Sequence, residues 1–262
     1  MPVNPWEALF LLRKNENVTT RQNPQSDVFF DCCSFMSLDS PDGNGGAVAV
    51  DQPITLVIKR TAFVGCSCQN EGGSVYVMGA TAILVCTEFV LSHSRSTRDD
   101  IGGNAFGIHQ TNLNASDFVV SRCWENTGCG DASYHVVNGV YDIRRYNVTD
   151  SFDGICGSAA GDFWTVSSDS LVSFANLVNN GGFACIVAYY SGIFISESLN
   201  ILNNTGIRQY FISTSNERTE FNRCCIFRAT GHGDSGPYTM KDCLTNFEFS
   251  GAETTETTLQ PF

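Results

Sequence analysis

Short apolar runs alternate with small polar corners along this chain, and Ile54–Val77 is the clearest copy of the pattern. It contains an apolar strand that reaches Phe63, a polar corner, the glycine pair Gly72-Gly73 and a second short strand. Apolar runs rich in β-branched and aromatic residues and bounded by glycine favour strands over helices. Looser copies follow along the chain, so the sequence predicts a repeat architecture.

One large residue before the corner anchors each copy. The anchors recur about every 27 residues, within the range of solenoid proteins. The third residue before each anchor is mostly apolar, and the third residue after it is mostly small and polar. We expect the second group to form a hydrogen-bonded ladder along the stack. The anchors are Phe35, Phe63, Phe89, Cys123, Tyr146, Leu177, Leu202 and Phe227.

The phase of the pattern changes within every copy. Positions five and three residues before the anchor share a strand face, because side chains alternate with period two, but the anchor breaks this parity. A bend must therefore fall between the third residue before the anchor and the anchor itself. A second strand follows a glycine pair at 45–50, 72–77 and 102–108. Glycine there permits a positive φ or a close backbone approach at a corner.

These features predict an all-β fold, a right-handed parallel β-helix of about eight coils spanning 28–250. Residues 1–27 would form an N-terminal cap and irregular segment, with Trp6–Leu12 as a helical turn over the first coil. Residues 251–262 would form a disordered polar tail. A leucine-rich repeat is the main alternative, since 171–180 resembles one, but its leucine and asparagine spacing is not sustained in the other copies.

The net charge of −12 argues against several classes of binding partner. Nucleic-acid binding normally requires a basic stripe, which the sequence lacks, so no nucleic-acid partner is expected. Acidity also argues against an acidic polysaccharide or a membrane surface as ligand. No run reaches the roughly 18–20 apolar residues of a membrane span, and the N-terminal stretch does not resemble a signal peptide. The chain is therefore expected to be intracellular or an incomplete gene product.

Enzymes on a β-helix need carboxylates clustered on adjacent coils, with arginine beside them to neutralise a uronate. Asp99-Asp100 is the best carboxylate pair. Gly231-His232-Gly233 resembles the GHG of polygalacturonases, but it lies about five coils farther along, so the two motifs cannot share a scissile bond. A solvated loop is the simpler interpretation of Asp99 and Asp100.

Glu88, Arg122 and Arg145 occupy the position directly before the anchor in three successive coils. If that position faces outward, the three side chains form an ion-paired ladder on the surface. The functional alternative is a strip that binds a carboxylate ligand. Exposed ion pairs are common and contribute only about 0–1 kcal/mol each, which favours the surface ladder.

Neither a metal nor a cofactor is expected. The acidic loops around Asp39, Asp99 and Asp131 lack the regular aspartate spacing of known calcium repeats. Cys66 and Cys68 form a lone CxC, which is a weak zinc signal. No motif pairs a histidine with a cysteine, so nucleophilic catalysis is not expected.

The 12 cysteines are few for a disulfide framework in a chain of 262 residues. Cys32, Cys86 and Cys224 lie three residues before their anchors and are predicted to form a reduced stack in the core, because a free cysteine behaves as a small hydrophobe. Cys66, Cys68 and Cys129 fall at corners or in insertions, where a disulfide would be feasible if the protein were exported.

The glycine-pair strands and the Phe-x-x-small corner resemble the GGA[ILV] and FxxN repeats of chlamydial polymorphic outer membrane proteins. They equally resemble the right-handed β-helix surface proteins of some protists. The resemblance implies a β-helical, passenger-like region, usually extracellular and involved in adhesion or display. The matching residues are Gly45-Gly46-Ala47-Val48, Gly72-Gly73-Ser74-Val75, Gly102-Gly103-Asn104-Ala105 and Phe63-Val64-Gly65-Cys66.

The leading hypothesis is a non-enzymatic, adhesin-like surface domain that presents loops and sheet faces to a protein or glycan. One alternative is a carbohydrate-active enzyme, a polysaccharide lyase or hydrolase on a pectate-lyase-like β-helix. Another is a gene fragment without an independent function. The open ends of the stack would also allow self-association.

Overall fold

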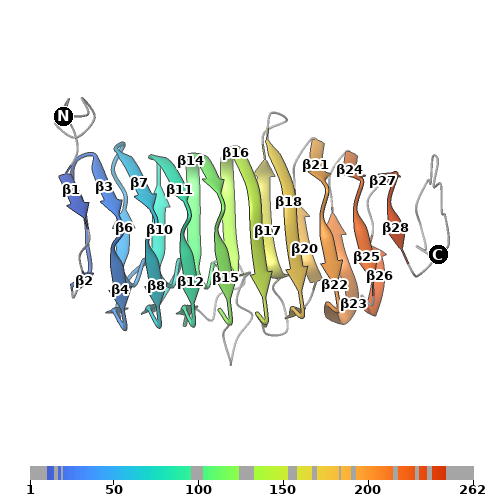
Figure 1. Ribbon diagram of the computed structural model, residues 1–262, viewed down its shortest axis with the longest axis horizontal. Coiled ribbons are helices and arrows are strands. Elements are labelled where there is room, and N and C mark those ends of the chain that lie inside the picture. The colour runs from blue at the N-terminus through green and yellow to red at the C-terminus, as the bar shows by residue number, and fades with distance from the viewer. Residues whose placement is uncertain are drawn as a thin grey trace.

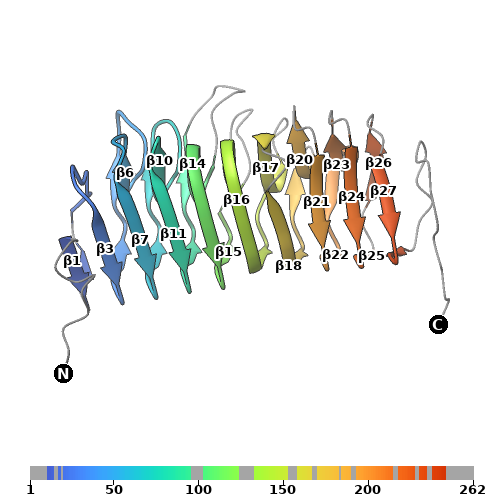
Figure 2. The ribbon, with the colours of Figure 1, turned by 90° about the horizontal axis from the view of Figure 1, so that it is seen from above.

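The computed structural model describes residues 11–14, 17–18, 20–95, 103–123, 133–152, 158–166, 170–182, 184–189, 193–214, 218–227, 230–234 and 238–245. All regular elements in these residues are strands, and the strand pairings are parallel. The strands stack coil upon coil along one axis, from the N-terminal end to the C-terminal end (Figure 1 and Figure 2). The predicted all-β class and parallel β-solenoid are therefore confirmed.

Each coil contributes strands to three main columns. The long column consists of β1 (Leu11–Lys14), β3 (Val28–Asp31), β7 (Thr55–Lys59), β11 (Thr81–Val85), β14 (Phe106–Ser116), β16 (Tyr134–Thr149), β18 (Leu171–Val178), β21 (Ile193–Glu197), β24 (Arg218–Asn222) and β27 (Tyr238–Lys241). The anchor column contains the ends of β16 and β18 together with β2 (Asn17–Val18), β4 (Ser34–Met36), β8 (Ala62–Val64), β12 (Glu88–Val90), β15 (Val119–Ser121), β22 (Asn200–Leu202), β25 (Cys225–Phe227) and β28 (Leu244–Thr245).

The glycine-pair column follows the corner of each coil. It contains the first residues of β14 and β16 together with β6 (Val48–Val50), β10 (Val75–Met78), β17 (Ser158–Val166), β20 (Ala184–Tyr189), β23 (Thr205–Thr214) and β26 (Thr230–Asp234), and β19 (Gly181–Gly182) pairs with β23. A separate three-stranded sheet consists of β5 (Asp39–Ser40), β9 (Ser67–Cys68) and β13 (His93–Ser94).

The stack begins earlier than the sequence suggested. Strands β1 and β2 lie within the segment predicted as a cap and irregular region, and β1 pairs with β3 in parallel register. The number of coils therefore differs slightly from the predicted eight or so. Leu11 and Leu12, expected in a helical turn, belong to strand β1. The predicted tail at 251–262 lies outside the described residues.

The bend between the long column and the anchor column was predicted correctly. One residue in each described bend adopts a left-handed backbone, a conformation that non-glycine residues visit only as isolated positions in turns. Its amide donates to a carbonyl of the next coil, as from Cys32 to Lys59 at 3.1 Å and from Arg60 to Val85 at 2.9 Å. These bend residues are Cys32, Arg60, Cys86, Asp117, Arg145, Phe174, Ser198, Arg223 and Asp242.

The core position next to this bend differs from the predicted one. The third residue before the anchor was expected in the core, but Cys86 is exposed there and Phe174 is 53% exposed. The following residue is buried instead, because the left-handed bend turns the next side chain inward. The buried residues are Cys33, Thr61, Thr87, Phe118, Tyr146, Ala175, Leu199, Cys224 and Cys243.

Strand register also corrects four of the eight anchors. The paired column runs Phe35, Phe63, Phe89, Val120, Val148, Leu177, Ile201 and Ile226. Cys123 and Tyr146 match the sequence pattern of an anchor and are buried, but they lie three residues after and two residues before the true positions. Leu202 and Phe227 are one residue out of register. Burial alone does not distinguish these positions, whereas the backbone pairing does.

Flat aromatic stacking fills the first coils of the core. The Phe63 ring stacks on Phe35 with 4.8 Å between centroids and on Phe89 with 5.1 Å. In-register strands lie about 4.8 Å apart, so identical residues at one position stack directly. The stack continues through Phe106 and Tyr134, whose rings lie 5.1 Å apart.

A buried ladder follows three residues after the anchors, as predicted, although the register assigns some of its members differently. The amide of Ser151 donates to Asn180 Oδ1 at 3.0 Å, and the amide of Asn180 donates to Asn204 Oδ1 at 2.8 Å. Asn180 Nδ2 donates to the Val148 carbonyl at 2.9 Å. Buried backbone groups at this corner are therefore satisfied by side chains of neighbouring coils.

Candidate functional site

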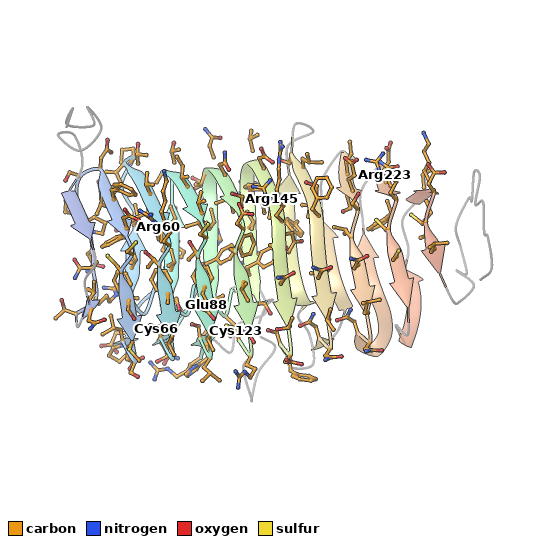
Figure 3. The ribbon with its side chains drawn as sticks, in the orientation of Figure 1. Arg60, Cys66, Glu88, Cys123, Arg145 and Arg223 are labelled. Carbon is orange, nitrogen blue, oxygen red and sulfur yellow. The ribbon has the colours of Figure 1, made fainter. Side chains whose placement is uncertain are left out.

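The three members of the predicted binding strip lie in three different columns. Glu88 directly precedes its anchor in β12, Arg122 lies two residues after Val120, and Arg145 is a bend residue. Figure 3 shows Glu88 in the lower part of the solenoid and Arg145 in the upper part. The predicted strip requires Cys123 and Tyr146 to be anchors, so the observed register separates its members. Asp99 and Asp100 lie outside the described residues.

Ion pairs form at the bend instead. Arg145 makes two hydrogen bonds to Asp117, the bend residue of the preceding coil, at 2.7 and 2.8 Å. These bonds hold the pKa of Asp117 below its ordinary value. Arg60 pairs with Asp31 in the same way, at 2.8 and 2.5 Å. Arg145 and Asp117 are both exposed, so their ion pair contributes little to stability. Arg60 is exposed but the Asp31 side chain is only 5% exposed, so Arg60 compensates a buried carboxylate. Both pairs join neighbouring coils and are better explained as structural ion pairs than as a ligand site.

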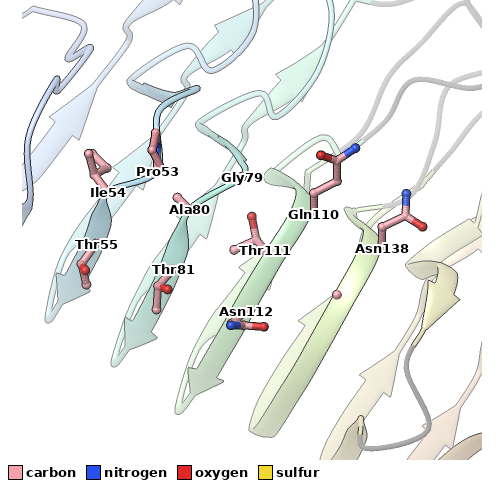
Figure 4. Close-up of a pocket in the computed structure, with 11 residues that line it drawn as sticks. Pro53, Ile54, Thr55, Gly79, Ala80, Thr81, Gln110, Thr111, Asn112 and Asn138 are labelled. Carbon is pink, nitrogen blue, oxygen red and sulfur yellow. The ribbon is translucent and has the colours of Figure 1, made fainter.

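A polar groove lies at the corner between the glycine-pair column and the long column. Its volume is about 590 Å³, and its walls come from four successive coils (Figure 4). None of the described residues that line it is charged. The lining residues are Pro53, Ile54, Thr55, Gly79, Ala80, Thr81, Gln110, Thr111, Asn112, Asn138 and Gly139.

Strand register arranges the groove's polar side chains in a row. Thr55 pairs with Thr81, and Thr81 pairs with Asn112 on the next coil. Gln110 and Asn138 turn the corner with left-handed backbones at φ of 49° and 51°. The hydroxyl and amide groups therefore repeat at the coil spacing of about 4.8 Å.

A second cluster lies on the outward side of the glycine-pair column. Glu71 precedes the Gly72-Gly73 corner, His109 belongs to β14 and His135 belongs to β16. His135 Nδ1 lies 3.2 Å from Glu71 Oε1, and His109 Nε2 contacts the same oxygen. The three ligand atoms all lie within 4.8 Å of one another.

Burial shapes the electrostatics of this cluster. The side-chain exposures are 7% for Glu71, 20% for His109 and 3% for His135. Burial alone would raise the pKa of Glu71, but hydrogen bonds from the two imidazoles outweigh it and lower that pKa below its ordinary value. Burial, together with the nearby Glu71 carboxylate, raises the pKa of Tyr76 to about 12. Glu71 is therefore ionised and Tyr76 neutral at physiological pH.

The Glu71–His109–His135 cluster was not predicted from the sequence. Its members are separated by 38 and 64 residues from Glu71, and no local spacing motif joins them. One signal was present. His109 and His135 both follow the start of a second strand, in GGNAFGIHQ and DASYHVV, so aligning those strands brings them to adjacent coils.

The described cysteines are all free thiols. Cys224 is buried as predicted, but Cys86 is exposed and Cys32 is half-buried at the bend. Cys66 and Cys68, which the sequence places at a corner, are fully buried. Burial raises the pKa of the Cys68 thiol to about 12. The predicted core position is therefore confirmed for Cys224, wrong for Cys86 and only partly met by Cys32.

No described helix is long and apolar enough to cross a membrane. Comparisons with protein-family models, with curated proteins and with solved structures found no match to this chain. The structure supports the coarse part of the sequence resemblance, a parallel β-solenoid, and the comparisons give no support to its link with chlamydial or protist surface proteins.

Proposed function

We propose that this protein is a non-enzymatic β-solenoid binding domain whose polar groove takes an extended, uncharged glycan. The observation that carries the proposal is the row formed by Thr55, Thr81 and Asn112 in register across neighbouring coils. An extended polymer that runs along the stack would meet a hydroxyl or amide at each coil. The lack of charge among the described lining residues favours a neutral ligand over an ionic one.

The groove suits a glycan better than a peptide. Peptides commonly bind to solenoids and sheets by adding a strand to a free edge. At this groove β7, β11, β14 and β16 are already paired on both sides within the stack, so their edges are occupied. Recognition must then come from side chains. Threonine hydroxyls and asparagine or glutamine amides both donate and accept, which matches the hydroxyl groups of a sugar.

The alternative of a lyase or hydrolase gains no support at this groove. Such chemistry requires a pair of carboxyl groups across the scissile bond, about 5–10 Å apart. The described lining residues supply none. Binding without turnover is the expectation that follows.

Titration calorimetry of the full chain against a panel of neutral oligosaccharides, including xylan, mannan and β-glucan fragments, tests this proposal. The double variant Thr81→Ala with Asn112→Ala should weaken binding about 5- to 150-fold, because each lost hydrogen bond is worth about 0.5–1.5 kcal/mol. Asn200→Ala, an exposed residue in the anchor column, is the matched control and should bind normally. Absence of binding to every neutral glycan, or equal binding by the double variant, would refute the assignment.

A further inference from the structure

The Glu71–His109–His135 cluster has the composition of a metal site. Two imidazole nitrogens and one carboxylate oxygen converge from three successive coils, and the sequence separation between them shows that the fold alone brings them together. His135 is in register with Gly107, which carries no side chain, and Gly107 is in register with Tyr76. This row therefore has no side chain between the Tyr76 and His135 positions.

Burial makes the arrangement costly unless a partner compensates it. An ionised carboxylate that is only 7% exposed loses much of its hydration, and its stability depends on the groups that replace water. The Tyr76 ring lies 5.7 Å from the His109 ring, and the Trp164 ring lies 6.1 Å from the His135 ring. These two aromatic rings further limit the space around the cluster. A divalent ion would compensate the Glu71 carboxylate more fully than hydrogen bonds from the two imidazoles.

We propose that Glu71, His109 and His135 bind a divalent transition-metal ion of the zinc type. Zinc takes histidine nitrogen and carboxylate oxygen at about 2.0–2.2 Å in tetrahedral geometry, which places ligand atoms about 3.3–3.5 Å apart. The 3.2 Å between His135 Nδ1 and Glu71 Oε1 is close to that spacing. His109 Nε2 already contacts the same Glu71 oxygen, and all three ligand atoms lie within 4.8 Å of one another, so small side-chain rotations would place them around one ion.

The donor set also argues against the common hard cations. Calcium and magnesium prefer six or more oxygen ligands, whereas this cluster offers nitrogen from two of its three members. Three protein ligands leave a fourth position on zinc for water or a small ligand. His109 is the most exposed member, at 20%, so the ion enters from its side.

The test uses the full chain, stripped of metal with a chelator and titrated with Zn²⁺ by calorimetry and with Co²⁺ by visible absorption. We expect one ion per chain, tetrahedral cobalt bands and a rise in melting temperature with Zn²⁺. His109→Ala and His135→Ala should each weaken Zn²⁺ binding on the order of 100-fold or more, since even changes behind the ligands cost about 10- to 100-fold. Glu71→Gln, which keeps the shape and removes the charge, should also weaken it.

His93→Ala is the matched control, because His93 is a partly buried histidine of β13 that does not belong to the cluster. It should bind Zn²⁺ like the unmodified chain. Where a variant fails to fold, imidazole ¹⁵N shifts of the unmodified protein identify the ligands, with changes expected only for His109 and His135. The proposal is overturned by the absence of stoichiometric Zn²⁺ binding, by a thiolate-to-cobalt charge-transfer band, or by affinity unchanged in both histidine variants. If the chain binds no metal, Glu71 is stabilised in this cluster only by its hydrogen bonds with His109 and His135.

Discussion

Among the described residues, two asparagine ladders share the same chemistry, one inside the solenoid and one on its surface. Asn180 lies inside, only 1% exposed, and donates to the Val148 carbonyl while accepting from the Ser151 amide. Asn176, four residues earlier, is exposed. It donates to Asn147 at 2.7 Å and accepts from Asn200 at 2.7 Å. Replacing each by alanine removes two hydrogen bonds, so burial is the main difference between the two variants.

The expected losses in the free energy of unfolding depend on which hydrogen-bonding groups each substitution leaves without a partner. Asn180→Ala leaves the Ser151 amide and the Val148 carbonyl buried and unsatisfied, at about 1–3 kcal/mol each. Water that enters the vacated space recovers part of this, so we expect a loss of about 2–4 kcal/mol in the free energy of unfolding. Asn176→Ala returns its partners to water and should cost less than about 0.5 kcal/mol. Asn180→Ser keeps an acceptor for the Ser151 amide and should fall between the two.

Urea denaturation followed by far-UV circular dichroism measures these differences, provided that the three variants share the m-value of the unmodified chain. Amide hydrogen exchange of the coils around Ser151 gives a local check, because solenoids can lose cooperativity along the stack. Equal destabilisation by Asn180→Ala and Asn176→Ala would refute the reasoning, since burial would then not decide the value of the ladder.

Two further outcomes follow from the packing and the thiol environments. Phe63→Ala removes a fully buried ring that stacks on its neighbours at 4.8 and 5.1 Å, and it should lower the free energy of unfolding by about 3–5 kcal/mol in the urea assay. Phe174→Ala removes a ring that is 53% exposed and should cost less than about 1 kcal/mol in the same assay. Iodoacetamide labelling with peptide mapping should modify the exposed Cys86 first and leave Cys68 unlabelled from pH 7 to 9. Burial raises the pKa of the Cys68 thiol to about 12, so little of the reactive thiolate forms in this pH range. Labelling of Cys68 at a rate comparable with Cys86, or similar losses for the two phenylalanine variants, would contradict these assignments.

Local pattern was enough to predict the fold class. The period-two alternation, the glycine pairs at 45–46 and 72–73 and the break in parity before Phe63 are properties of neighbouring residues. Each constrains the backbone within a few positions, and together they require a coil that bends at a fixed place. The ladder at Asn180 was predicted for the same reason, because its offset from Leu177 is short and belongs to one strand and corner.

Register between coils depended on the tertiary structure. Insertions of different length separate the copies, so Cys123 and Tyr146 matched the sequence pattern as well as Val120 and Val148 did, and only backbone pairing distinguished them. For that reason, Arg145 does not lie in one column with Glu88 and Arg122, as the predicted binding strip required.

The convergence of Glu71, His109 and His135 has the same origin. Their contact depends on how three successive coils stack. Aligning the second strands brings His109 and His135 to adjacent coils, but no local spacing in the sequence joins Glu71 to them. The sequence by itself determined the shape of one coil. The tertiary structure decided which side chains of different coils meet, because parallel pairing of the backbone sets that alignment residue by residue.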